Sequence, residues 1–182
     1  MILVQRGDHR AFSALYDRYA SRMKAFFFRM LWSDHAKAED FVHDLFTKVI
    51  ERPELYQPHL PFTPWLFQVA SNMCKNAYRR RAFEVAYLSQ LDTNNVHAPA
   101  AEQKIDEELI LKRLNVILEQ LDEMKRELFL LRYQQQFSIR ELAAIFNTTE
   151  GTIKSRLFHI RKTLLEHLNE EKLVSEYEKS RG

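Results

Sequence analysis

Polar side chains suited to reading DNA recur at helical spacing near the end of the sequence. Serine, threonine, arginine and histidine can hydrogen-bond to base edges in the major groove, and lysine and arginine bind phosphates. The candidates for base edges are Thr152, Ser155, Arg156 and His159, and those for phosphates are Lys154, Arg161 and Lys162. At about 100° per residue, these seven side chains lie on and around the side of a helix that is opposite an apolar stripe. The pattern predicts a DNA-binding helix; the alternative is a surface helix with a solvated basic face.

The residues before this helix complete a recurring motif. Ser138 and Glu141 have the spacing of a capping box at the start of a short apolar helix. Asn147 tolerates the left-handed backbone conformation that short turns often need, and Thr149 can cap the next helix. A capped helix, a short turn and a basic second helix together predict a helix-turn-helix.

Two further helices are expected ahead of the helix-turn-helix, because apolar residues recur there at spacings of three and four. Asp122 can cap the second of these helices. The apolar stripes are Leu109, Ile110, Leu114, Ile117, Leu118 and Leu121 in the first helix, and Met124, Leu128 and Leu131 in the second.

A second polar row is expected on a helix that opens at Thr63 and Pro64, which suit the N-cap and the first helical position. Glutamine and asparagine carry the donor–acceptor pairs that base reading needs, and tryptophan can stack on an unpaired base. The row consists of Trp65, Gln68, Asn72, Lys75 and Arg79. The helix is predicted to close in Arg79, Arg80 and Arg81, which either bind phosphates or are solvated. The buried face is predicted to be Leu66, Val69, Ala70, Met73 and Ala77, although Trp65 is equally compatible with a core position.

Two earlier helices complete the first half of the chain. Their apolar stripes are Phe12, Leu15, Tyr16, Tyr19, Met23, Phe26, Phe27 and Met30, and then Ala38, Phe41, Val42, Leu45, Phe46 and Val49. The second helix also carries an exposed polar face at spacings of three and four, made of Asp40, His43, Asp44 and Thr47. By residue type alone, this face is more typical of a solvated acidic surface than of a binding site.

The composition limits the class of protein. The 182 residues include only 3 Gly and 5 Pro, which disfavours an all-β fold. The net charge is +2, but residues 1–81 carry 13 Lys and Arg against 8 Asp and Glu, so basic charge is concentrated locally. We predict an all-α protein with two small helical domains. These are residues 1–81 and 105–168, with a flexible linker at 82–104 and a charged, fraying tail at 169–182.

Several other classes of protein find no support in the sequence. Cys74 is the only cysteine, which excludes an internal disulfide and favours a buried or half-buried thiol. No spacing of His and Cys is typical of a metal site, so we expect neither metal nor cofactor. No apolar run approaches the roughly 20 residues that span a bilayer, and the N-terminal run is too short for a signal peptide. We therefore expect a cytoplasmic protein.

Five segments resemble, in order, extracytoplasmic-function (group 4) sigma factors of bacterial RNA polymerase. Residues 38–46 (AEDFVHDLF) look like that family's polymerase-binding helix, and residues 61–72 (PFTPWLFQVASN) look like its promoter-melting helix. Residues 128–133 (LFLLRY) and 137–143 (FSIRELA) fit its fourth region, and residues 150–161 (EGTIKSRLFHIR) resemble its recognition helix. The shortness of the chain fits this class, which lacks a third folded region.

The resemblance implies a protein that directs RNA polymerase to promoters without catalysing a reaction. Its second region would bind the polymerase clamp helices and open the minus-ten element, where Asn72 matches a base-reading position. Its fourth region would bind the minus-thirty-five element as duplex, and an anti-sigma protein would hold the factor inactive. The residues that the resemblance assigns to the clamp are Asp40, His43, Asp44 and Thr47.

The sequence departs from the family pattern in two places. Residues 134–136 (QQQ) stand where relatives commonly have an acidic residue and a glycine, so the glycine of a tight helix end is missing. His43 stands where relatives often have glutamine, and both side chains can donate and accept hydrogen bonds.

Two other interpretations share part of the pattern. A stand-alone helix-turn-helix regulator with an N-terminal helical sensing domain explains the second half, but not the polar row or the acidic face of the first. The other interpretation is an enzyme, because His43 and Asp44 together are typical of the metal ligands of helical phosphohydrolases. That chemistry needs further His and Asp ligands around the same metal, and the phosphate-loop and nucleophile-elbow motifs of other enzymes are absent.

Overall fold

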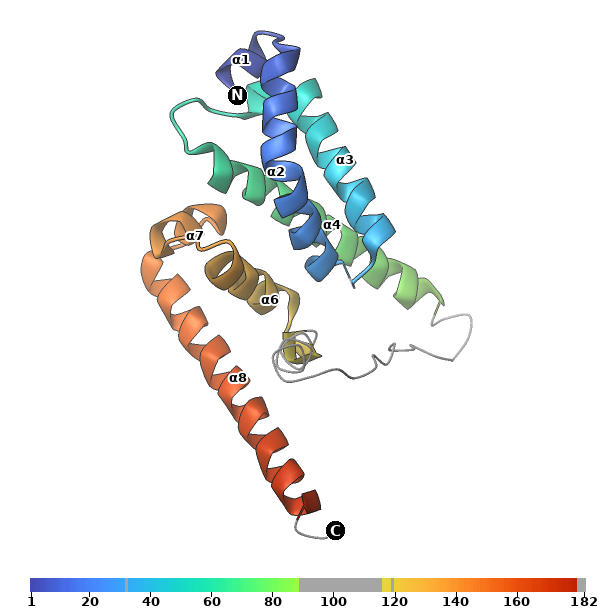
Figure 1. The fold of residues 1–182 in the computed structure, drawn as a ribbon, viewed down its shortest axis with the longest axis vertical. Coiled ribbons are helices and arrows are strands. Elements are labelled where there is room, and N and C mark those ends of the chain that lie inside the picture. Colours follow the sequence, from blue (N-terminus) through green and yellow to red (C-terminus); the bar gives the residue numbers. More distant parts are fainter. Residues whose placement is uncertain (32, 89–115, 119, 180–182) are drawn as a thin grey trace. The chain divides into compact units, whose positions relative to one another are not determined.

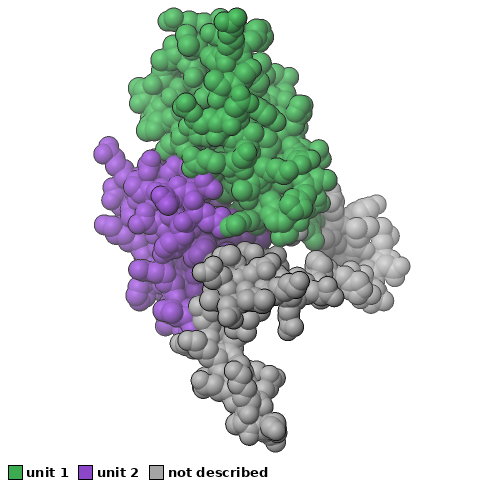
Figure 2. Space-filling model, in the orientation of Figure 1, with its two compact units in different colours: residues 1–100 green, residues 101–182 purple. Residues whose placement is uncertain are grey.

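The residues that the computed structural model describes are 1–31, 33–88, 116–118 and 120–179 (Figure 1). Every regular element in these ranges is helical. The chain divides into two compact units, residues 1–100 and residues 101–182 (Figure 2). The predicted all-α fold with two helical parts is therefore confirmed.

Side-chain caps begin two long helices of the first unit. Helix α2 (His9–Met30) follows Asp8, whose carboxylate accepts hydrogen bonds from two first-turn amides at 2.9 and 3.0 Å. Helix α3 (His35–Glu51) follows Asp34, which accepts from one first-turn amide at 3.0 Å. These bonds satisfy amides that the first turn of a helix leaves unpaired.

The predicted apolar stripes of α2 and α3 meet in a core rich in aromatic residues. Phe26, Phe27 and Phe46 are each at most 2% exposed. The ring of Phe27 meets that of Phe41 edge-on at 5.4 Å, and the ring of Phe26 meets that of Phe67 on the next helix at the same distance. Such edge-on pairs add to the free energy gained by burying apolar surface, which is about 1.5–3 kcal/mol for one such side chain.

Two short helical elements of the first unit are not predicted from the sequence. They are α1 (Ile2–Gln5) and η1 (Pro53–Leu55). Gln5 Nε2 donates hydrogen bonds to the carbonyl oxygens of Pro53 and Tyr56 at 2.8 and 2.9 Å. Helix α1 thereby holds the segment that leads from α3 into the next helix.

Helix α4 (Phe62–Leu88) extends beyond the predicted limits at both ends. Thr63 lies inside the helix and is not its N-cap; its Oγ1 lies 2.8 Å from the hydroxyl oxygen of Tyr19. The helix also continues past Arg81, so the first residues of the predicted linker are helical. The rest of that linker, residues 89–104, lies outside the described residues.

The buried face of α4 is rotated from the predicted one. Phe67, Cys74 and Tyr78 are buried, whereas Val69 and Ala77 are only half-buried. The other three predicted core positions are buried as expected, and so is the lone thiol. Tyr78 can lie inside because its hydroxyl finds a hydrogen-bond partner there.

The second unit begins, as far as it is described, with a helical turn at residues 116–118, the end of the predicted helix of that region. Asp122 then caps α6 (Glu123–Phe129) through a first-turn amide at 2.9 Å, as predicted. Buried Arg126 donates hydrogen bonds to two carbonyl oxygens before the cap, at 2.9 and 3.3 Å. Helix α6 passes into a π-helical turn, η2 (Leu130–Gln134).

The predicted helix-turn-helix consists of α7 (Ile139–Ile145) and α8 (Glu150–Lys179). The capping box is present: the Glu141 amide donates to Ser138 Oγ at 3.2 Å, and the Ser138 amide donates to Glu141 Oε2 at 2.8 Å. Asn147 adopts the left-handed conformation in the turn, with φ +48°. Helix α8 includes most of the charged tail that the sequence predicts to fray.

Candidate nucleic-acid interface

The polar side chains predicted to read DNA lie on the accessible part of α8. Lys154, Ser155, His159, Arg161 and Lys162 are exposed, and Thr152 and Arg156 are half-buried. The opposite stripe is buried and consists of Ile153, Leu157, Ile160 and Leu164. At about 100° per residue, Ser155, His159 and Lys162 lie at the centre of the polar side. Helix α8 therefore presents hydrogen-bonding groups flanked by cations on one face.

Two threonines hold the start of α8. Thr149 Oγ1 accepts a hydrogen bond from the Thr152 amide at 3.2 Å, which confirms the predicted cap. The two hydroxyl oxygens lie 2.9 Å apart, so the hydroxyl of Thr152 already takes part in the helix start. A hydroxyl group has one donor and two acceptor sites, and Thr152 therefore retains capacity for a further contact.

The structure brings five of the polar residues predicted on α4 into one row. Asn72 and Arg79 are exposed, and Trp65, Gln68 and Lys75 are half-buried. At about 100° per residue, these five side chains lie within about 80° of one another around the helix. The row therefore combines two amide side chains, which can read bases, with two cations and an aromatic ring.

Trp65 has aromatic neighbours at the start of α4. The ring centroids of Tyr56 and Phe62 lie 5.1 and 5.7 Å from its ring. The Tyr56 hydroxyl donates a hydrogen bond to the Leu60 carbonyl at 2.6 Å, which braces the preceding loop. Trp65 also lines a cavity of about 320 Å³ together with Leu55. It thus combines partial packing with access to an open cavity, as a stacking platform requires.

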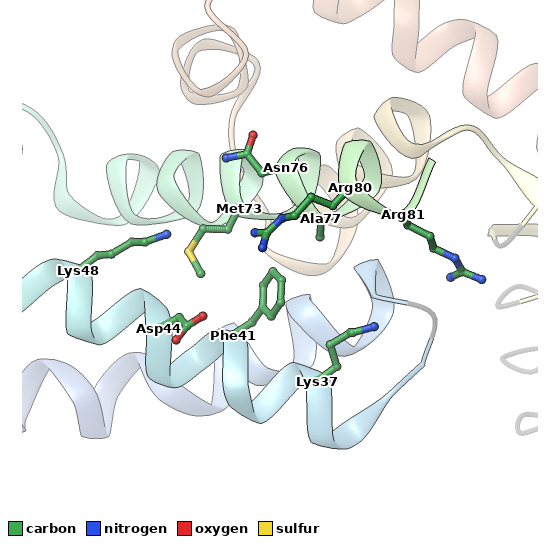
Figure 3. Close-up of a pocket in the computed structure, with 9 residues that line it drawn as sticks. All are labelled: Lys37, Phe41, Asp44, Lys48, Met73, Asn76, Ala77, Arg80 and Arg81. Atoms are coloured by element: carbon green, nitrogen blue, oxygen red, sulfur yellow. The ribbon is translucent and has the colours of Figure 1, made fainter. Parts of the chain in front are cut away.

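Arg80 does not lie with the other members of the predicted row. One residue step turns it about 100° from Arg79. It lines the cavity between α3 and α4, where Asp44 and Phe41 also lie (Figure 3). The structure therefore places the two neighbouring arginines on different sides of the helix.

The residues predicted to bind the polymerase clamp form a ridge of α3 that borders two cavities. Asp40 and His43 line a cavity of about 480 Å³ between α2 and α3, together with Tyr16. Asp44 lines the other cavity, of about 370 Å³, between α3 and α4. Thr47 is half-buried on the same helix, and the other three are exposed.

An ion pair joins α2 to α3 beside the first of these cavities. The Lys24 ammonium group donates a hydrogen bond to the Glu39 carboxylate. This hydrogen bond and the positive charge of Lys24 hold the pKa of Glu39 below its ordinary value. Both side chains are largely exposed, so the pair stabilises the fold little. Lys24 neutralises Glu39, whereas no ion pair among the described residues involves Asp40, the other acid that lines this cavity.

Residues 1–31, 33–88, 116–118 and 120–179 contain no candidate metal site and no helix suited to span a membrane. No group of three or more His, Cys, Asp or Glu side chains in these ranges is arranged to hold a metal ion. His43 and Asp44 therefore gain no further ligand in that part of the chain. None of the described helices combines the length and the apolarity needed to cross a membrane.

Comparison with known proteins assigns both units. Residues 15–84 match the family model of sigma-70 region 2, and residues 111–164 match that of sigma-70 region 4. The chain is 32% identical over 165 residues to the RNA polymerase sigma factor CarQ of Myxococcus xanthus, covering 90% of this chain and 92% of CarQ. It is 25% identical over 176 residues to the sigma factor SigW of Bacillus subtilis, covering 92% of this chain and 94% of SigW. The chain belongs to the extracytoplasmic-function sigma factors, which are DNA-binding factors of transcription initiation.

Solved structures agree with this assignment. The sigma factor RpoE of Bartonella quintana, in complex with the anti-sigma factor NepR, aligns with a TM-score of 0.70 at 27% identity. The alignment covers 88% of this chain and 98% of RpoE. CnrH, in complex with the cytosolic domain of CnrY, aligns with a TM-score of 0.68 at 23% identity and shows the same fold. The match to region 2 also accounts for the half of the chain that a stand-alone regulator leaves unexplained.

The cavity between α3 and α4 is a feature that the sequence analysis missed. On α3 it is lined by Lys37, Phe41, Asp44 and Lys48, at spacings of four, three and four. This spacing marks one stripe of a helix and was available in the sequence. The residues of α4 that face this stripe cannot be identified from the sequence, because they depend on how the two helices pack.

Proposed function

We propose that this protein is a group 4 sigma factor that binds core RNA polymerase in the cytoplasm and directs initiation at a restricted set of promoters. It catalyses no reaction itself and acts by binding. The observation that carries the proposal is that each unit has a helix with one accessible polar face: the row on α4 and the face of α8. Two such faces in one chain suit two separate elements of a promoter.

Helix α8 binds the minus-thirty-five element as duplex DNA. Its polar side enters the major groove, where side chains contact base edges and cations on the flanks hold phosphates. The base-edge set is Thr152, Ser155, Arg156 and His159, and the phosphate set is Lys154, Arg161 and Lys162. The buried apolar stripe and the cap at Thr149 support this role, because they hold the helix rigidly for docking.

The row on α4 binds the minus-ten element as it opens. Gln68 and Asn72 read bases, and Lys75 and Arg79 hold the backbone. Trp65 supports an unstacked base, and the cavity beside it offers space for one. Unpairing costs a few kcal/mol, which stacking on the indole ring repays in part.

The ridge of α3 binds the clamp helices of core polymerase through Asp40, His43, Asp44 and Thr47. Its support is the exposure of Asp40, His43 and Asp44 and the open cavities on both sides. An anti-sigma protein regulates the factor by competing for such surfaces. The relative from Bartonella quintana, which was solved with its anti-sigma factor, supports this part of the proposal.

Promoter binding with and without core polymerase tests the proposal. We expect the isolated chain to bind promoter duplex weakly and the holoenzyme to bind it specifically. Asp44→Arg should lower affinity for core polymerase without unfolding the protein, whereas Glu54→Arg, an exposed acid off the ridge, should not. Equally tight, specific binding by the isolated chain would show a stand-alone regulator instead.

A further inference from the structure

The cavity between α3 and α4 combines an apolar floor with charged walls (Figure 3). Phe41 of α3 faces Met73 and Ala77 of α4 across it. Its volume is about 370 Å³, which is room for several side chains of a partner. Neither the predicted minus-ten row nor the cavity between α2 and α3 includes this floor.

Charge is unevenly distributed around the cavity. Four cations and a single acid line it, namely Lys37, Lys48, Arg80, Arg81 and Asp44. Within the described part of the chain, no ion pair involves Lys48, Arg80 or Asp44. Among the described residues, the positive charges of Lys48 and Arg80 thus have no ion-pair partner. A negatively charged group entering the cavity would meet two unpaired cations.

Arg80 is directed into this cavity and away from the DNA-facing row. Figure 3 shows its side chain extending from α4 toward Phe41, whereas that of Asn76 points away from α3. Arg79, one residue earlier, lies about 100° around the helix with Asn72. The cavity that Arg80 enters is instead bordered by Asp44, a residue of the ridge proposed to bind polymerase.

We infer that the α3–α4 cavity is a second contact with core polymerase, in which Arg80 and Lys48 receive an acidic side chain from a polymerase segment. The inference rests on the proposed function and extends its polymerase-binding surface from α3 to α4. A protein segment suits the cavity better than a DNA strand does. The apolar floor of Phe41 and Met73 suits apolar side chains next to the acid, which a phosphate backbone lacks.

Charge reversal at two neighbouring arginines tests the inference. Full-length Arg80→Glu and Arg79→Glu variants compete with labelled wild type for core polymerase, and each assembled holoenzyme is then titrated with promoter DNA. We expect Arg80→Glu to lose about tenfold in core affinity and to keep its promoter affinity once assembled. Arg79→Glu should keep its core affinity and lose promoter affinity once assembled. Arg80→Lys should retain core binding.

The outcomes separate the inference from the proposed function. If Arg80→Glu binds core polymerase as tightly as wild type does, the inference alone is overturned. The inference is also overturned if Arg80→Glu loses only promoter affinity, because Arg80 would then contact DNA. A wild-type chain that does not bind core overturns both. Thermal unfolding should be the same for both charge-reversed variants, since both arginines are exposed. Arg80→Ser replaces Arg80→Glu if the reversal lowers stability.

Discussion

The hydroxyl of Tyr78 in α4 donates a hydrogen bond to the carbonyl oxygen of Met30, the last residue of α2. The last four carbonyl groups of a helix have no partner within it, and Tyr78 supplies one of these partners from another helix. Both residues are buried, so water cannot take the place of the hydroxyl. The bond joins the helix that bears the proposed minus-ten row to the main helix of the bundle.

Tyr78→Phe should therefore destabilise the first unit by about 1–3 kcal/mol, because a buried carbonyl group loses its partner. Both tryptophans of the chain, Trp32 and Trp65, precede residue 100 in the sequence, so tryptophan fluorescence during denaturation reports on the unfolding of the first unit. Tyr16→Phe is the matched control. The Tyr16 ring packs 4.8 Å from that of Phe46, and phenylalanine keeps that contact. Equal midpoints for the two variants would contradict a stabilising role for the bond.

Gln136→Gly should stabilise the second unit. Gln136 has φ +59°, a left-handed conformation that costs residues with a Cβ about 1–2 kcal/mol and glycine little. We expect a gain of about 1 kcal/mol in the free energy of unfolding, measured by hydrogen exchange of buried amides in this unit. Gln135→Gly is the control: its φ is −93°, and glycine there should destabilise by about 0.5–1 kcal/mol. A control as stable as Gln136→Gly would exclude relief of backbone strain as the cause.

Asp122→Ala should destabilise the second unit by about 1 kcal/mol at neutral pH, as for other lost N-caps. Partial burial raises the pKa of Asp122, but hydrogen bonds to Lys125 and its charge outweigh this, so the pKa lies below its ordinary value of 3.8. A carboxyl group with a lowered pKa in the folded state stabilises the fold above its ordinary pKa. The stabilisation is lost as pH falls through the lowered value. The difference between wild type and Asp122→Ala should therefore shrink in acid, and a difference that stays constant with pH would contradict the charged cap.

Arg156→Ala combined with Lys162→Ala should weaken binding of the minus-thirty-five duplex. Lys162 is exposed, and its Nζ lies 3.8 Å from Oε1 of Glu166. This loose pairing leaves the Lys162 side chain able to reach a phosphate. The slope of log affinity against log salt is negative, and each lost phosphate contact reduces its magnitude by about 0.9. The magnitude should therefore decrease by about one in the double variant. Lys125→Gln on α6 is the control and should leave the slope unchanged. An unaltered slope in the double variant would place these cations away from DNA.

The local features of the second unit follow from the sequence. The caps at Asp122, Ser138 and Thr149 each involve an amide three residues ahead, so the responsible groups are neighbours in the chain. The left-handed turn at Asn147 likewise depends on the residue type itself. At Gln136, by contrast, the same conformation occurs in a residue type that does not favour it, so no residue type in the sequence indicates it.

The features that depend on distant residues could not be predicted. Tyr78 and Met30 are 48 positions apart, and no local pattern indicates their hydrogen bond. Helix α4 has apolar residues on more than one side, so the choice of Phe67 over Val69 as a core residue depends on where α2 and α3 lie. The sequence underestimates the length of this helix, because the three arginines at residues 79–81 are typical of the last turn of a helix.

In the candidate sites, too, the sequence predicts what one helix determines by itself and misses what depends on packing between helices. All seven polar residues proposed on α8 are accessible at least in part, because one helix with a single buried stripe determines which side faces outward. On α4, a run of arginines looks uniform in sequence, yet the helix turns Arg80 away from Arg79. The cavity that receives Arg80 exists only where α4 packs against α3.

The decisive measurement is run-off transcription by bacterial core polymerase on a library of start sites, with and without this protein. We expect initiation from a restricted set of promoters only when the protein is present, and loss of that initiation in the Arg156→Ala, Lys162→Ala double variant. Absence of protein-dependent initiation from every template would contradict its role as a sigma factor.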